Sequence, residues 1–319
     1  MDVVILSLAE GSGDSCGSGC GGCGSACATP RTPVLACADA LRAGGAQVDT
    51  VLAGSDQEID EVLARFDGPE RADALTWPGT RDDLRLVVAT ATDAQLRAVM
   101  RRMVRRWAPS PSKRPADLEA TRTVPDLPAL AILPLDPANA VDLAAQLGLP
   151  RTPAEVAQAV LAGSVKRLDL LRNDGGSVTL DGALLGGADD NGAAVPWRGR
   201  VEVDDHVLSE GEEPILACVV GNGGGYAEFD GLRLLSEGNL ADGRVEVAVA
   251  VPVVVKQRFK KTTRVRIEVR RASGRAVSVL PREGELQFLD DGVAGSTTRK
   301  RSWWTEAGAW AVYAQTPVG

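Results

Sequence analysis

Histidine is almost absent from this chain, and aromatic residues are few. The 319 residues include a single histidine, His206, which excludes zinc sites built on several histidines and any mechanism that needs two of them. A catalytic triad would have to use His206, but residues 203–207 predict a strand end or a turn, where a histidine at the surface is the simpler interpretation. Because only 4% of the residues are aromatic, aliphatic side chains must fill most of the core.

The chain also lacks an excess of basic charge and long apolar runs. It has 43 acidic and 35 basic residues, for a net charge of -8, so general binding to nucleic acid is not expected. No apolar stretch is long enough to cross a bilayer, and the amino terminus has no basic targeting signal. We therefore expect a soluble, cytoplasmic protein with no nucleic-acid partner.

The hydrophobic pattern changes at about residue 165, which predicts two domains. In residues 1–164, apolar strands alternate with amphipathic helices, and this alternation predicts an α/β domain with a parallel sheet. In residues 165–319, short strands separated by Gly and Asp turns predict an antiparallel, sandwich-like β domain. The predicted fold class is therefore α/β followed by β. The expected helices are 33–43, 57–66, one that Asp93 caps and that runs to Trp107, 139–147 and 153–162. The first strands are 3–8, 47–53, 84–89 and 130–135.

A series of short motifs recurs along both domains in a characteristic order. It begins with Ala-Ile-Leu-Pro-Leu at 131–135 and continues through 139–144, 147–150, 165–170, 219–225, 241–247 and 288–292. In this order the chain resembles the catalytic domain of the diacylglycerol kinases, whose nucleotide-binding domain is similar to those of NAD kinases and phosphofructokinases. The resemblance implies ATP-dependent phosphorylation of a lipid hydroxyl, with ATP and Mg²⁺ as cofactors and a lipid or small molecule as substrate.

The resemblance also implies where the site residues lie. Thr92, Asp93 and Asn139 fall in the two nucleotide loops, and Asp290 or Asp291 takes the place of the general base. A carboxylate suits that role because it can accept the proton of the hydroxyl that attacks the γ-phosphate. A tight Asp-Gly turn explains the same residues equally well, so both interpretations stay open.

The departures from the family pattern fall in these same loops. Where the family has Gly-Gly-Asp-Gly-Thr, this chain has Ala91 to Gln95, and the added methyl groups crowd a phosphate that glycines would admit. In the second loop Asp136 would repel phosphate, and Pro137 removes an N–H donor. Two hypotheses follow: a lipid kinase of the diacylglycerol kinase type, or a kinase fold that has lost ATP chemistry and acts as a binding or regulatory module.

Glycine and cysteine dominate residues 10–29, directly after the first strand. Cys16, Cys20, Cys23 and Cys27 are separated mainly by Gly and Ser, which lets four thiolates converge on zinc or on an iron–sulfur cluster. A redox pair formed by Cys20 and Cys23, and a chemically idle loop, are the alternatives. Cys37 and Cys218 lie among apolar residues and are expected to be buried structural thiols.

Basic residues gather in two further places. The stretches 256–271 and 299–301, with Trp303 and Trp304 beside the second, would allow peripheral contact with an anionic membrane, but a charged hairpin with core tryptophans is favoured. Five arginines of the helix that runs to Trp107 are expected to form a solvated face rather than a ligand site. The sequence does not determine the oligomeric state.

Overall fold

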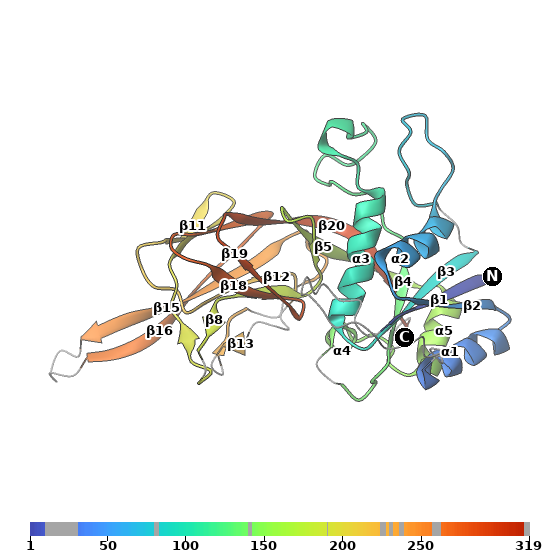
Figure 1. Ribbon diagram of the computed structural model, residues 1–319, viewed down its shortest axis with the longest axis horizontal. Coiled ribbons are helices and arrows are strands. Elements are labelled where there is room, and N and C mark those ends of the chain that lie inside the picture. The colour runs from blue at the N-terminus through green and yellow to red at the C-terminus, as the bar shows by residue number, and fades with distance from the viewer. Residues whose placement is uncertain are drawn as a thin grey trace, which may run out of the picture. The chain divides into compact units, whose positions relative to one another are not determined.

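The computed structural model describes two compact units. The described residues are 1–9, 31–79, 83–139, 142–189, 191–223, 228–229, 232–235, 239–256 and 263–315. The first unit comprises Met1–Leu168 and the chain from Gly308 onward, and the second comprises Asp169–Ala307 (Figure 1). The carboxyl-terminal residues thus belong to the first unit, whereas the sequence placed everything after residue 164 in one domain.

A parallel sheet forms the centre of the first unit. Its strands β1 (Asp2–Leu8), β2 (Gln47–Ala53), β3 (Leu84–Thr90) and β4 (Leu130–Pro134) lie in the order β4-β3-β1-β2. The end of β20 (Arg301–Tyr313) adds a further parallel strand, because Val312 pairs with Leu130. Strands β1, β3 and β4 are almost continuously apolar, as is typical of a sheet covered on both faces, whereas β2 contains several polar residues and is largely exposed.

Helices cover both faces of this sheet. Helices α1 (Thr32–Ala43) and α5 (Pro153–Ala162) pack on the face that includes Val3 and Ile5. Figure 1 shows α2 (Asp56–Leu63) and α3 (Asp93–Trp107) on the other side. The short segments are η1 (Ala64–Phe66), η2 (Pro111–Lys113) and α4 (Leu143–Gln146).

Local signals in the sequence set the ends of these helices. The Ser55 side chain accepts a hydrogen bond from the Glu58 backbone N–H and so caps α2. Thr152 and Glu155 form a reciprocal capping box at the start of α5, and Gly163 ends that helix with a left-handed φ of 75°. Such caps satisfy the backbone groups that a helix end leaves without partners.

Two antiparallel sheets form the second unit. One contains β5 (Val165–Asn173), β6 (Val178–Thr179), β10 (Gly199–Val203), β11 (His206–Glu210), β17 (Ala276–Pro281) and the first half of β20. The other has the order β16-β15-β12-β7-β18-β19, formed by β7 (Gly182–Leu185), β12 (Ala217–Gly221), β15 (Val245–Lys256), β16 (Thr263–Gly274), β18 (Leu286–Asp290) and β19 (Val293–Thr297). Two short pairs complete the unit: β8 (Gly187–Ala188) with β9 (Ala194–Val195), and β13 (Glu228–Phe229) with β14 (Leu232–Arg233).

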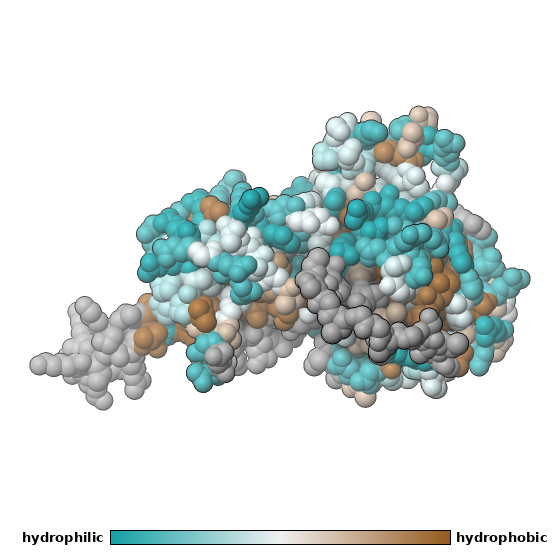
Figure 2. All heavy atoms as spheres, in the orientation of Figure 1, coloured by the Kyte–Doolittle hydropathy of each residue, from teal (hydrophilic) through white to brown (hydrophobic). Residues whose placement is uncertain are grey.

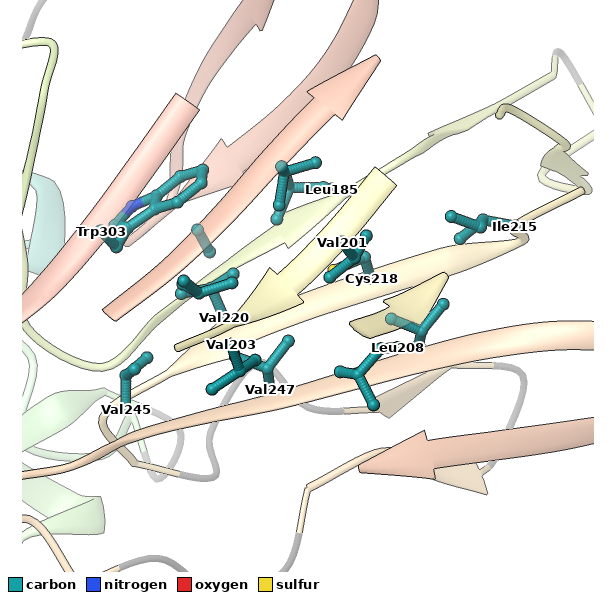
Figure 3. Close-up of a cluster of buried hydrophobic side chains, with 14 of the residues drawn as sticks. Leu185, Val201, Val203, Leu208, Ile215, Cys218, Val220, Val245, Val247 and Trp303 are labelled. Atoms are coloured by element: carbon teal, nitrogen blue, oxygen red, sulfur yellow. The ribbon is translucent and has the colours of Figure 1, made fainter. Parts of the chain in front are cut away.

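Side chains from both sheets of the second unit meet in one apolar core. Figure 3 shows Val201 and Trp303 from one sheet beside Leu185, Cys218 and Val247 from the other. This face-to-face packing is that of a β-sandwich. The predicted fold class is therefore confirmed in both of its parts.

Several individual expectations can be compared with this structure. Trp303 is fully buried, which confirms its predicted place in the core, and the single histidine, His206, is exposed at the start of β11. In the part of the chain that the structure describes, no helix is both long and apolar enough to cross a membrane.

Candidate functional site

The loop between β3 and α3 holds the first two predicted nucleotide-site residues. Both carboxylate oxygens of Asp93 accept the backbone N–H of Leu143, at 3.1 and 3.2 Å. The Gln95 side chain accepts the Ala91 N–H at 2.8 Å, and Thr92 occupies the N-cap of α3 without a side-chain cap hydrogen bond. Asp93 therefore joins the start of α3 to the start of α4.

The segment after β4 holds the third predicted residue, Asn139. The Asn139 N–H donates to the Asp136 carbonyl at 3.2 Å, and the Asp136 carboxylate accepts the Ala138 N–H at 3.1 Å. These bonds fold residues 136–139 into a compact turn at the carboxyl end of β4. Because Asp93 binds Leu143, the structure brings both predicted nucleotide loops to the same edge of the parallel sheet.

An arginine that the sequence analysis did not single out holds this edge together. Arg151 forms an ion pair with Asp142, with one contact of 3.0 Å, and it donates to the carbonyls of Pro137, at 3.2 Å, and Asn139. Hydrogen bonding to Asp142 raises the pKa of the Arg151 guanidinium against the effect of burial, and the charges of Asp142, Asp136 and Asp93 add to the rise. Nothing in the spacing of Arg151 and Asp142 marks them as a pair.

Several carboxylates gather among the described residues of this edge. The carboxylates of Asp142, Asp136 and Asp93 lie close enough to the Arg151 guanidinium for their charges to raise its pKa. Phosphate groups are stabilised at helix N-termini by free backbone N–H groups and by positive charge. Here the Leu143 N–H is bound by Asp93, and the guanidinium of Arg151 is bound by Asp142 and by backbone carbonyls.

In the second unit, Asp290 and Asp291 lie where β18 turns into β19. Asp290 pairs with Val293, so Asp291 and Gly292 form a two-residue hairpin loop. Both loop residues have positive φ, 47° for Asp291 and 80° for Gly292. Two positive values identify a type I′ turn, which Asp-Gly favours. The tight-turn interpretation of these residues therefore describes the observed backbone.

The Asp291 carboxylate is buried beneath this turn and fully engaged with the backbone. It is 1% exposed, and it accepts the N–H groups of Leu180 at 2.6 Å, Asp181 at 3.0 Å and Gly182 at 3.1 Å. Asp290 is 0% exposed and accepts the Thr179 hydroxyl at 2.7 Å. Both carboxylates fasten the β18–β19 hairpin to the segment 179–182.

Other residues of the family motifs converge on this segment. The Asn222 side-chain amide donates to the carbonyls of Asp169, at 2.7 Å, and Leu180, at 3.3 Å. The Asp169 carboxylate accepts the Gly243 N–H at 2.6 Å. Four motifs that are far apart in the sequence therefore share one buried hydrogen-bond network. In this network the motif side chains hold the backbone together.

The cysteine predictions divide into two groups. Cys16, Cys20, Cys23 and Cys27 lie outside the described residues, so their proposed metal site stays a prediction. Within the ranges that are described, no cluster of three or more His, Cys, Asp or Glu residues could hold a metal ion. Cys37 and Cys218 are buried, as expected, and burial raises the pKa of each thiol to about 12.

The arginines of α3 are more engaged than the sequence predicted. Arg97 is 5% exposed, so the prediction of a solvated face is wrong at that position. Arg102 binds Asp60 of α2, and Arg106 binds Asp67, through paired hydrogen bonds. Figure 2 shows the hydrophilic surface that these elements form. The side chains thus stabilise the packing of α2 against α3.

Comparison with known proteins identifies the fold. No protein-family model and no curated protein sequence matches the chain. A solved structure of a diacylglycerol kinase from Bacillus anthracis str. Sterne aligns with a TM-score of 0.60 and 14% identity, over 99% of this chain and 98% of that one. An NAD kinase from Archaeoglobus fulgidus in complex with ATP aligns with a TM-score of 0.49 and 11% identity, over 98% and 93%. The expected resemblance is confirmed: the chain has the diacylglycerol kinase-like fold.

Proposed function

We propose that this chain is a kinase-fold protein that does not transfer phosphate from ATP and acts as a binding or regulatory module. The observation that carries the proposal is the state of Asp291. A general base must reach the hydroxyl that it deprotonates, but this carboxylate is 1% exposed and accepts three backbone N–H groups. These hydrogen bonds hold the hairpin in place, and the buried carboxylate is out of reach of a substrate hydroxyl.

The nucleotide edge of the first unit supports the same conclusion. The methyl groups of Ala91 and Ala94 occupy positions that the family fills with glycine. Asp136 and Asp142 add negative charge where triphosphate would lie, and Arg151 is already bound to Asp142 and to two carbonyls. Repulsion between carboxylates and phosphate opposes binding most strongly where water is excluded.

A second candidate is an active lipid kinase of the diacylglycerol kinase class, using ATP and Mg²⁺. The observation in its favour is that nearly the whole chain shares the fold of a diacylglycerol kinase. In that case Thr92, Asp93 and Asn139 would lie near the nucleotide, and Asp290 or Asp291 would act as the base. The substrate would be a lipid or small molecule, and the basic stretch 256–271 could contact a membrane.

In a regulatory module, the cysteine loop would be the part that binds a ligand. Zinc or an iron–sulfur cluster bound by Cys16, Cys20, Cys23 and Cys27 would couple the state of the fold to metal or redox conditions. A cytoplasmic location, as expected from the sequence, would keep these thiols reduced.

Nucleotide binding tests the proposal. Isothermal titration of the full chain with ATP and MgCl₂ should give no saturable binding below about 1 mM, a concentration at which kinases commonly bind substrates. A diacylglycerol kinase of the same fold is the positive control. Saturable, Mg²⁺-dependent ATP binding in the micromolar range would favour the second candidate.

A further inference from the structure

A cavity of about 610 Å³ lies in the first unit, away from the nucleotide edge. Its lining includes Leu84, which begins β3, and Ala129, which directly precedes β4. It therefore opens at the amino ends of the parallel strands, whereas Asp93 and Asn139 follow their carboxyl ends. Ligands of this class of sheet bind at the carboxyl ends, so the cavity is separate from the candidate site.

Two long loops form walls of the cavity, and polar contacts hold both of them. Arg71 binds Asp73 at 2.9 Å and Asp117 at 3.1 Å, and its guanidinium lies 4.0 Å from the centre of the Trp77 ring. In the second loop Arg114 donates to the backbone carbonyls of Leu118, Glu119 and Arg122. The cavity is thus built by defined side-chain contacts.

Arg122 is the most informative residue of the lining. It is 9% exposed, and its Nη1 donates to Asp126 at 2.5 Å. Its Nε and Nη2 are buried and have no hydrogen-bond partner among the described residues, and the same holds for Trp77 Nε1. Nε and Nη2 form one side of the guanidinium, with two parallel N–H groups. That spacing matches the two oxygens of a carboxylate.

We propose that this cavity binds a small monocarboxylate with an apolar body. The carboxylate would accept from Arg122 and Trp77, whose buried donors otherwise lack an acceptor. Phe66, Leu118, Leu127 and Tyr313 supply apolar lining, and the volume is that of a small-molecule site. Asp117, Glu119 and Asp126 also line the cavity, and so do Arg85 and Arg167 beside Arg122, so the charges of the lining nearly cancel. A singly charged carboxylate suits such a lining better than a multiply charged phosphate. Because the free donors have almost no exposed surface, the wall must shift locally when the ligand enters.

Calorimetry of the full chain with 3-phenylpropionate tests this proposal. We expect saturable one-to-one binding that weakens at least about tenfold for the neutral analogue 3-phenylpropanamide, because the paired charge-assisted hydrogen bonds are lost. Arg122→Gln should weaken binding of the carboxylate to a similar extent. Arg105→Gln is the matched control, since Arg105 is an exposed arginine of α3, and it should leave the affinity unchanged.

Several outcomes would overturn the proposal. The first is no saturable binding of 3-phenylpropionate up to about 5 mM, a concentration that detects even weak ligands. The second is equal affinity for the carboxylate and the amide, and the third is tighter binding of inorganic phosphate than of the carboxylate. If Arg122→Gln fails to fold, Trp77→Phe decides, because it keeps an aromatic ring and removes only the indole N–H. Unchanged affinity in folded Trp77→Phe would contradict the assignment.

Discussion

Replacing Asp291 with Asn separates a structural carboxylate from a catalytic one. Asn has the same shape as Asp, and Asn-Gly is a preferred pair for the type I′ turn that Asp291 and Gly292 adopt. The backbone of the hairpin therefore loses nothing by the change. What is lost is one of the two oxygens that accept the N–H groups of Leu180, Asp181 and Gly182.

The expected cost follows from these three bonds. If the Asn oxygen faces Asp181 and Gly182, its NH₂ group faces the Leu180 N–H, which now donates to the carboxylate at 2.6 Å. Two donors then oppose each other in a buried site. Leaving a buried donor unpaired and weakening two charge-assisted bonds costs about 2–4 kcal/mol in the free energy of unfolding. The lower value applies if removal of a buried charge offsets part of the loss.

Hydrogen exchange measures this cost at the site itself. Protection of the amides at 180–182 should fall by about 30- to 900-fold in Asp291→Asn, which is the same free energy expressed as an equilibrium ratio. Asp204→Asn is the control: Asp204 also has a positive φ, 48°, in a hairpin loop and accepts the N–H groups of Arg275 and Ala276, but it is exposed. Its stability should change by less than about 1 kcal/mol, because water can replace the lost acceptor. Unchanged protection in Asp291→Asn would refute the structural role.

Three further predictions concern other parts of the chain. Burial would raise the pKa of Asp67, but hydrogen bonds from Arg106 and Trp107 and the Arg106 charge together lower it. Asp67→Asn should therefore lower the free energy of unfolding near pH 7, and in urea titrations its difference from wild type should shrink as the pH falls from about 4 through the lowered pKa. A difference in unfolding free energy that stays constant with pH would contradict this. Arg151→Met should lower the free energy of unfolding by about 1–3 kcal/mol, since it leaves the Asp142 carboxylate and two backbone carbonyls without their donor. Arg105→Met is the control, and an equal loss of stability in both variants would count against the role of Arg151. Wild-type protein, made with zinc and iron and kept reduced, should carry about one zinc ion or one iron–sulfur cluster per chain. The Cys20→Ser/Cys23→Ser variant should lose this metal, and Cys218→Ser should keep it because Cys218 is a buried thiol. Metal-free wild type, or metal retained in the double variant, would exclude the site.

Local patterns were sufficient to predict much of the fold. Apolar residues at helical spacing predicted α3 through Trp107, although Thr92 and not the expected Asp93 is its N-cap. Thr152, Pro153 and Gly163 mark the observed start and end of α5. Helix caps and hydrophobic periodicity act within a few residues, so they can be read directly from the sequence. The order of the family motifs then indicated how the elements are arranged.

The contacts that define the candidate site depend on residues far apart in the chain. Arg151 binds Asp142 across a loop, and Asp291 binds backbone groups more than a hundred positions away. No short sequence pattern predicts either of these contacts. Arg122 is similar, because its burial against the cavity depends on two loops that meet only in the folded protein. For Asp291 the sequence allowed two interpretations, a turn residue and a catalytic base. Its three backbone hydrogen-bond donors become visible only in the folded structure.

Transfer of labelled phosphate from ATP to lipid tests the central claim most directly. The full chain is incubated with γ-labelled ATP, Mg²⁺ and vesicles that contain diacylglycerol, beside a diacylglycerol kinase of the same fold. We predict no labelled lipid above the enzyme-free background, because Asp291 is buried in backbone hydrogen bonds and the nucleotide edge is acidic. Labelled lipid formed at about 1 turnover per second or faster, as is typical of kinases, would contradict the account, especially if Asp291→Asn abolished turnover in a protein that remained folded.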